Sequence, residues 1–165
     1  MIALSASPGI GIGEVKVILD LNDLYKIKKG DVLVTVMTNP DMVVTMQKSA
    51  AIITDEGGAT CHAAIVSREM GIPCIVGAKV ATKKLKDGMI VTVDGSRGKV
   101  YEGQVRELPN TKIEIKSIVE TKTKIKVMVD LPDFASRAAK TGCKDVGLVR
   151  LEGIIAESGK HPFVF

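Results

Sequence analysis

The segment DEGGATCHAAI, residues 55–65, combines residue types that could form a phosphate site around His62. The glycine pair Gly57–Gly58 allows the backbone to turn sharply and to approach a ligand closely. His62 follows in the first turn of a predicted helix, where unpaired N–H groups and the positive helix end favour an anion. The same field disfavours imidazolium, so His62 is expected to be neutral and nucleophilic. The pattern indicates a phosphate either bound beside the ring or carried on it, with the Thr60 hydroxyl as a further donor.

Other roles for these residues stay open from the sequence alone. A histidine near a helix start can also cap the helix or complete a packed core. No metal site is predicted, because the only other histidine is His161 and the chain has no Cys/His cluster. Cys61 could be an activated thiol at the helix end, but a small packing residue is the preferred interpretation. Asp55 and Glu56 are interpreted as solvated acids before a glycine turn rather than as acid–base groups.

The elements that must position this motif follow from hydrophobic patterning and from helix start and stop signals. A buried strand is predicted over 32–37, and a short apolar strand ending at Thr54 comes directly before the motif. The motif helix is predicted over about 61–70, with Gly71 as its C-cap. A further strand is predicted over 74–78.

Glycine and polar residues predict the remaining elements of the same unit. The three glycines of SPGIGIG are interpreted as a turn that precedes a strand, because the alternating EVKVILD follows them. A dinucleotide site would instead need a helix at that point. Asn39 before a proline predicts a helix start. A short helix over 81–86 and a hairpin with its turn at Asp94–Gly95 complete the unit.

The chain divides into three parts by pattern and composition. Residues 1–103 form the predicted compact α/β unit, and the charged, weakly patterned residues 104–122 are predicted to be a linker or hinge. Residues 123–165 are predicted to form a strand, a helix and a strand, over 125–129, 132–140 and 146–149. A single βαβ unit needs a parallel sheet covered on both faces, so this part is predicted to begin a larger domain.

Composition excludes several classes of function. The chain has 165 residues, 45% of them hydrophobic, which suits one ordinary domain plus a remainder. A net charge of +4 from interspersed charges, with only 3% aromatic residues, does not indicate nucleic-acid binding. No apolar run is long enough to span a membrane, and no signal peptide is recognised. The three cysteines are predicted to be reduced thiols of a cytoplasmic protein.

The segment TDEGGATCHAAIVSREMGIPCIVGA, Thr54–Ala78, closely resembles the phosphohistidine signature of the phosphoenolpyruvate-utilising enzymes. This family includes phosphoenolpyruvate synthase (pyruvate, water dikinase), pyruvate phosphate dikinase and enzyme I of the sugar phosphotransferase system. Cys61 before the histidine, and the stretches SPGIGIGEVKV and GDVLVTVMTNPDMV, are most similar to the synthase branch. The resemblance implies an α/β fold: a swivelling β/β/α phosphohistidine domain, then a linker and an incomplete βαβ piece of a TIM barrel.

The resemblance also implies that the chain is the phosphoryl carrier of a phosphoenolpyruvate synthase. His62 would be transiently phosphorylated with phosphate derived from ATP and would pass it to pyruvate, with Mg²⁺ bound outside this chain. By the same resemblance, Gly57, Gly58, Thr60 and Cys61 support the phosphate and the loop, and Thr60 is a regulatory phosphorylation position. Arg150, at the end of a barrel strand, would contact the phosphate of phosphoenolpyruvate.

The implied partners lie outside the chain. They are an ATP-grasp domain and a complete TIM-barrel domain, in a cytoplasmic and homo-oligomeric enzyme, so the chain alone is not expected to run the full reaction. Two alternatives stay open. One is an enzyme-I-like phosphocarrier that passes phosphate from phosphoenolpyruvate to a protein acceptor. The other is a non-catalytic module that binds a phosphorylated ligand and never carries a covalent phosphate.

Overall fold

The computed structural model describes residues 1–105, 121–129, 135–149, 151 and 155. The chain forms two compact units, Met1–Thr111 and Lys112–Phe165, and each is described by itself. Arg150, His161 and most of the predicted linker fall outside the described residues. Among the helices of the described part, none is long and apolar enough to cross a membrane.

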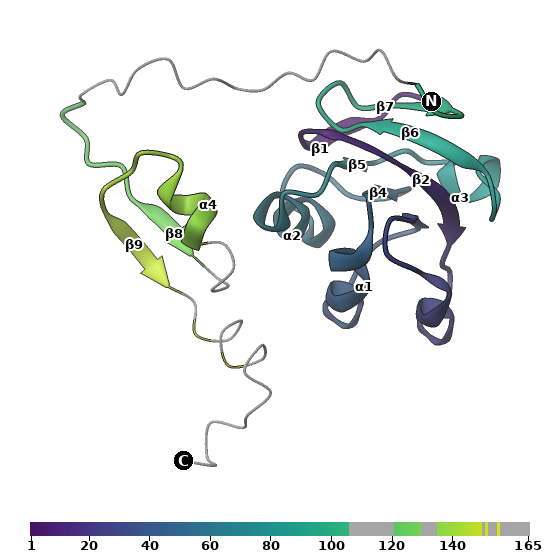
Figure 1. Cartoon of the computed structure of the whole chain (residues 1–165), viewed down its shortest axis with the longest axis horizontal. Helices are drawn as coiled ribbons and strands as arrows, with labels where there is room; N and C mark the ends of the chain where they lie inside the picture. Colours follow the sequence, from purple (N-terminus) through teal and green to yellow (C-terminus); the bar gives the residue numbers. More distant parts are fainter. Residues whose placement is uncertain (106–120, 130–134, 150, 152–154, 156–165) are drawn as a thin grey trace. The chain divides into compact units, whose positions relative to one another are not determined.

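A mixed seven-stranded sheet forms the first unit, in the order β1-β5-β4-β3-β2-β6-β7 (Figure 1). Strands β2 to β5 run parallel, while β1 pairs antiparallel with β5, β6 with β2, and β7 with β6. The strands are β1 (Leu4–Ser7), β2 (Ile10–Val17), β3 (Val32–Thr35), β4 (Ala51–Thr54), β5 (Cys74–Val76), β6 (Ile90–Asp94) and β7 (Lys99–Glu102).

The first residues of the chain join the two ends of this sheet. Ile2 forms an antiparallel bridge with Lys99, and the Met1 amino group donates a 2.9 Å hydrogen bond to the Val100 carbonyl. The Val100 amide in turn donates to the Met1 carbonyl at 2.9 Å. The sheet therefore curls until β1 and β7, its outermost strands, are linked through residues 1–3.

Two hydrophobic cores lie on opposite faces of the central strands, because side chains alternate along each strand. Leu33 and Ile52 belong to the core that also holds Met46, Ala63 and Ala64 of the two longer α-helices. Val34 and Ile53 belong to the core enclosed by the curled sheet, to which Ala81 of a short helix also contributes. This arrangement confirms the predicted α/β class, with one curled, mixed sheet and helices packed against it. The helices are η1 (Leu21–Lys26), η2 (Pro40–Met42), α1 (Val43–Lys48), α2 (His62–Met70) and α3 (Ala81–Lys84), where η denotes a 3₁₀ helix.

The strand and helix predictions for this unit are largely confirmed, with shorter bounds. The strand predicted over 32–37 ends at Thr35, and the strand predicted to end at Thr54 does so. Asn39 is the N-cap of η2, as the sequence indicated, although its side chain makes no capping hydrogen bond. Neither β1 nor η1 was predicted, because both are short and lack a clear hydrophobic period.

The interpretation of the N-terminal glycines as a turn before a strand holds for Gly9, which has a φ of 122° just before β2, but it is wrong for Gly11 and Gly13, which lie inside β2. A Cβ atom at Gly11 would stand 2.2 Å from the Ala50 carbonyl oxygen, and one at Gly13 would stand 2.1 Å from the Gly30 carbonyl oxygen. Both glycines are needed because neighbouring backbone crosses β2 too closely for any side chain.

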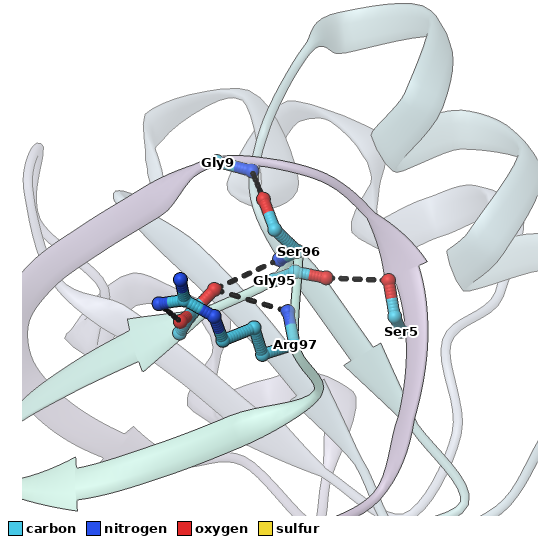
Figure 2. Close-up of polar contacts among 6 residues, drawn as sticks. Ser5, Gly9, Gly95, Ser96 and Arg97 are labelled. Atoms are coloured by element: carbon cyan, nitrogen blue, oxygen red, sulfur yellow. Dashed lines mark hydrogen bonds and ion pairs between the residues drawn. The ribbon is translucent and has the colours of Figure 1, made fainter. Parts of the chain in front are cut away.

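The hairpin between β6 and β7 is confirmed, but its turn is longer than predicted and spans residues 95–98. Figure 2 shows how this turn is fixed to β1 and to the loop that follows it. The Ser5 hydroxyl donates to the Gly95 carbonyl at 2.5 Å, and the Gly9 amide donates to the Ser96 hydroxyl at 3.1 Å. The buried Asp94 carboxylate accepts hydrogen bonds from two amides of the turn. The turn therefore ties the β6–β7 hairpin to β1 and to the loop after β1.

The described part of the second unit is a strand, a helix and a strand. They are β8 (Val127–Val129), α4 (Ala135–Ala139) and β9 (Val146–Val149), and the two strands pair in parallel. This confirms the predicted βαβ connection, while the helix start predicted at 132 lies outside the described residues. All four residues of β9 are exposed. Its membership of a barrel stays a prediction.

Candidate functional site

The predicted site lies at the edge of the sheet where the parallel strands β3, β4 and β5 end. The strand ladder continues into the following loops: the Asp55 amide donates to the Thr35 carbonyl at 3.0 Å, and the Ala78 amide donates to the Thr54 carbonyl at 3.0 Å. Three loops, over 36–39, 55–61 and 77–80, are thereby held side by side. Ligands of open α/β sheets bind at this kind of edge.

Helix α2 places His62 at its first residue, so the prediction of a helix start at the motif is confirmed. Cys61 is the N-cap, with an extended backbone and no capping hydrogen bond from its side chain. The helix ends at Gly71, which has a left-handed backbone at φ 69°, as predicted for the C-cap. Ala63 and Ala64 are buried against the sheet, so the small side chains after His62 bring the helix close to the strands.

The His62 ring is held by Thr38, a residue that the sequence did not indicate. Its Nδ1 lies 2.8 Å from the Thr38 hydroxyl oxygen, and Thr38 is only 8% exposed. This contact fixes the orientation of the imidazole ring and occupies Nδ1. Nε2 is therefore the nitrogen that is free to react. When Nδ1 carries the proton and donates it to Thr38, the lone pair lies on Nε2, as a nucleophile requires.

Burial lowers the pKa of His62 below its ordinary value. The sequence predicted a neutral ring from the field of the helix end, and the structure supplies desolvation as the cause instead. Either cause favours the uncharged imidazole at neutral pH. A ring that is half-buried and neutral can reach a ligand and still offer a lone pair.

The glycine loop before His62 is shaped by close packing at one of its two glycines. Gly57 has a φ of 115°, and a Cβ atom there would stand 2.7 Å from the Cys61 sulfur. Gly58 has open space around it. Thr60 is exposed, and its side chain makes no hydrogen bond with the part of the chain that the structure describes. Cys61, partly buried against the core on which α2 packs, is a small packing residue under the loop.

Two charged residues hold the backbone around this loop. The Arg68 guanidinium donates from Nε to the Ala64 carbonyl at 2.8 Å and from Nη2 to the Ala59 carbonyl. Asp55 is 8% exposed, and its carboxylate accepts hydrogen bonds from the amides of Ala81 and Thr82 at the start of α3. The interpretation of Asp55 as a solvated acid is therefore wrong. Its partner helix lies 26 residues away, so no local pattern could have revealed this role.

The chemistry of the remaining candidate ligands is limited. All three cysteines are free thiols, and burial raises the pKa of Cys74 to about 12, so this thiol is inert at neutral pH. Among the described residues, no three His, Cys, Asp or Glu side chains are grouped so that they could hold a metal ion. No group of described side chains could therefore hold Mg²⁺ by itself.

Comparison with known proteins identifies the first unit. A family model described as "PEP-utilising enzyme, mobile domain" matches residues 27–98, a range that includes the glycine loop, Thr38 and His62. Phosphoenolpyruvate synthase of Pyrococcus furiosus is 56% identical over 98% of this chain and 21% of its own length. Probable phosphoenolpyruvate synthase of Archaeoglobus fulgidus is 53% identical over 98% of this chain and 22% of its own length.

A solved solution structure of Enzyme I (nEIt) is 30% identical, with a TM-score of 0.44, over 51% of this chain and 35% of that chain. The chain spans about a fifth of the length of the curated synthases that it matches. The chain therefore contains, over residues 27–98, a mobile (phosphohistidine) domain of the PEP-utilising enzyme family.

Proposed function

We propose that this chain carries a phosphoryl group on Nε2 of His62 within a phosphoenolpyruvate synthase reaction. The observation that supports this most directly is the 2.8 Å contact between Nδ1 and Thr38, because it leaves Nε2 as the reactive nitrogen. The lowered pKa of His62 and its place at the first residue of α2 favour a neutral nucleophile beside a site for an anion.

The proposed reaction is two displacements at phosphorus. The Nε2 lone pair forms a P–N bond while a P–O bond of the ATP-derived donor breaks, and its leaving group takes the electron pair. An enolate oxygen derived from pyruvate later attacks the same phosphorus, and the P–N bond breaks to restore the neutral ring. Before the second displacement, water attacks the terminal phosphorus of a pyrophosphoryl group carried on Nε2, and the P–O–P bond breaks to release inorganic phosphate and leave one phosphoryl group on the ring. The chain contributes the nucleophile and its positioning, which are the main requirements of phosphoryl transfer.

The rest of the proposed enzyme lies outside the described residues. An ATP-grasp domain would supply the donor, and a complete TIM barrel would hold pyruvate or phosphoenolpyruvate together with Mg²⁺. Arg150 would contact the substrate phosphate from that barrel, and Thr60 would be the position of regulatory phosphorylation. Thr60 is exposed and two residues before His62, so a protein kinase could reach it and a phosphate there would repel one on the ring. A cytoplasmic, homo-oligomeric enzyme completes the proposal.

The intact mass of the chain tests the carrier function. The chain is mixed with Mg²⁺, phosphoenolpyruvate and the Pyrococcus furiosus synthase from which the segment aligned with residues 1–103 is deleted. That remainder must first be shown to be folded and to bind phosphoenolpyruvate. One acid-labile phosphoryl group on the chain, absent from His62→Ala, is the expected result. A chain that gains no phosphoryl group under these conditions would favour the non-covalent phosphate-binding module.

The acceptor is identified in a second step with the phosphorylated chain. Release of the label to pyruvate together with the synthase remainder supports the synthase reaction. Release to a small carrier protein, with no transfer to pyruvate, would instead support the enzyme-I-like phosphocarrier.

A further inference from the structure

The Arg68 guanidinium joins helix α2 to the glycine loop that precedes it. Nε donates to the Ala64 carbonyl of the same helix at 2.8 Å, and Nη2 donates to the Ala59 carbonyl in the loop. Among the described residues, no other side chain forms a hydrogen bond with residues 57–60. Two of these four residues are glycines, whose backbone has wide conformational freedom. A charged bond at Ala59 therefore has a large effect on the conformation of this loop.

Arg68 and His62 lie on opposite flanks of the buried stripe of α2. An α-helix turns by about 100° per residue, so side chains six residues apart are separated by about 120° around its axis. The buried residues of α2, which are Ala63, Ala64 and Ser67, fill the sector between them. Arg68 is exposed on the far side of this sector. Its guanidinium is therefore placed to act on the loop, and not on a group that His62 carries.

The bond from Arg68 fixes the direction of one peptide in the loop. The Ala59 carbonyl and the Thr60 amide belong to the same trans peptide, so they point in opposite directions. Because Arg68 holds the carbonyl on its own flank of α2, the Thr60 N–H is directed toward the flank that carries His62. That N–H, like the other amides of residues 57–60, donates to no described residue. It is therefore available to an incoming ligand.

An N–H donor at this place suits the chemistry of phosphoryl transfer. Negative charge is spread over the phosphoryl oxygens as the group moves to or from Nε2. A donor that is already oriented stabilises that charge without any rearrangement at the moment of reaction. Thr60 lies two residues before the first residue of α2, so its N–H adds to the unpaired N–H groups of the helix start. A peptide turned the other way would present the Ala59 carbonyl oxygen to the phosphate and repel it.

We propose that Arg68 is a positioning residue for phosphoryl transfer, which holds the Ala59 carbonyl so that the Thr60 N–H donates to the phosphoryl group on His62. This inference rests on the proposed carrier function. The guanidinium contacts neither the ring nor the phosphate, and acts only through the peptide between residues 59 and 60. Its two bonds require the planar fork of arginine, because two different nitrogens hold the Ala59 and Ala64 carbonyls.

The rate of His62 phosphorylation by phosphoramidate, a small donor that needs no partner domain, gives the first test. Arg68→Gln removes the fork and the charge, whereas Arg68→Lys keeps the charge on a single nitrogen. Both variants are expected to react about ten-fold more slowly than the unchanged chain, because the donor N–H is misplaced rather than removed.

Amide NMR of Thr60 gives a second test, which a loss of stability alone would not affect. In the unchanged chain, phosphorylation of His62 should shift the Thr60 amide proton downfield, as expected when an N–H donates to a charged oxygen. In Arg68→Gln this shift should be much smaller. Chemical denaturation measures how far the substitution also weakens the fold, so that both tests are run where the variant is folded.

Arg97→Gln is the matched control. Arg97 is also an exposed arginine, and it pairs with Asp94 at 3.3 Å in the hairpin of β6 and β7. A Cβ atom at Gly95 of that turn would stand 3.1 Å from the Cys74 amide nitrogen, so the turn lies at the start of β5. His62 lies at the opposite edge of the sheet, where the parallel strands end. This variant should therefore keep the phosphoramidate rate and the amide shift of the unchanged chain.

Three results would overturn the inference. They are an unchanged rate in Arg68→Gln, a full rate in Arg68→Lys, and a Thr60 amide of the unchanged chain that does not shift when His62 is phosphorylated. Each of them leaves the carrier function intact, because His62 still gains the phosphoryl group. Absence of phosphate on His62 of the unchanged chain, both with phosphoramidate and with the synthase remainder and phosphoenolpyruvate, would instead refute the carrier function.

Discussion

Replacement of Thr38 by valine isolates the contribution of a single hydroxyl to the reactivity of His62. Valine retains the shape of threonine, so the packing of this buried residue is preserved while the 2.8 Å contact to Nδ1 is lost. A hydrogen bond contributes about 0.5–1.5 kcal/mol net. If that energy orients the ring and keeps the proton on Nδ1, its loss should slow phosphorylation at Nε2 by about two- to twelve-fold.

The assay for Thr38→Val is the rate of His62 phosphorylation by phosphoramidate, followed by intact mass. Nitrogen NMR of the ring reads the tautomer directly, and the chain has only two histidines to assign. Thr38→Ser retains a hydroxyl and should restore most of the rate. A Thr38→Val protein with the same tautomer and the same rate as the unchanged chain would refute the reasoning that this contact prepares Nε2.

Four further predictions concern pH, backbone and thiol chemistry. Because burial lowers the pKa of His62, the folded state binds fewer protons than the unfolded state near pH 6, so the unfolding free energy should rise with pH there; a flat profile that matches His62→Ala would contradict this. Gly57→Ala should destabilise the fold by about 2 kcal/mol in chemical denaturation, because of its φ of 115° and its close packing, whereas Gly58→Ala has open space and should cost less. Lys79 has a φ of 64°, so Lys79→Gly should raise the unfolding free energy by about 0.5 kcal/mol, and a clear loss would show that the lysine side chain supports the fold. Cys74 should resist alkylation at neutral pH until the protein unfolds, and labelling at the rate of an exposed thiol would disprove its burial.

Hydrophobic patterns and helix stop signals in the sequence were enough to predict α2 and β4. The extent of α2 and its closure at Gly71 followed from a glycine after an apolar period, and β4 followed from an uninterrupted apolar run that ends at Thr54. The predicted β/β/α layering came from resemblance to a family, because seven short strands of mixed direction give no period that specifies how a sheet curls.

Features that depend on contacts between distant segments could not be predicted. Thr38 and His62 are 24 residues apart, so neither residue indicates the other in the sequence. The glycines of β2 look like a turn in the sequence. In the fold, the backbones of Ala50 and Gly30 lie so close to β2 that no side chain fits at these glycines. In both cases the role of the residue becomes clear only in the fold, where segments distant in the sequence lie side by side.

The pairing of residues 1–3 with β7 has a consequence for how the first unit can be connected to other domains. Ile2 and Lys99 are bridged, so the incoming and outgoing segments of the unit lie next to each other. A unit of this kind can be inserted into a loop of a longer protein without forcing the flanking segments of its host apart. Joining residue 103 to residue 1 with a short linker, and opening the chain at an exposed loop, should therefore give a circular permutant that keeps the fold.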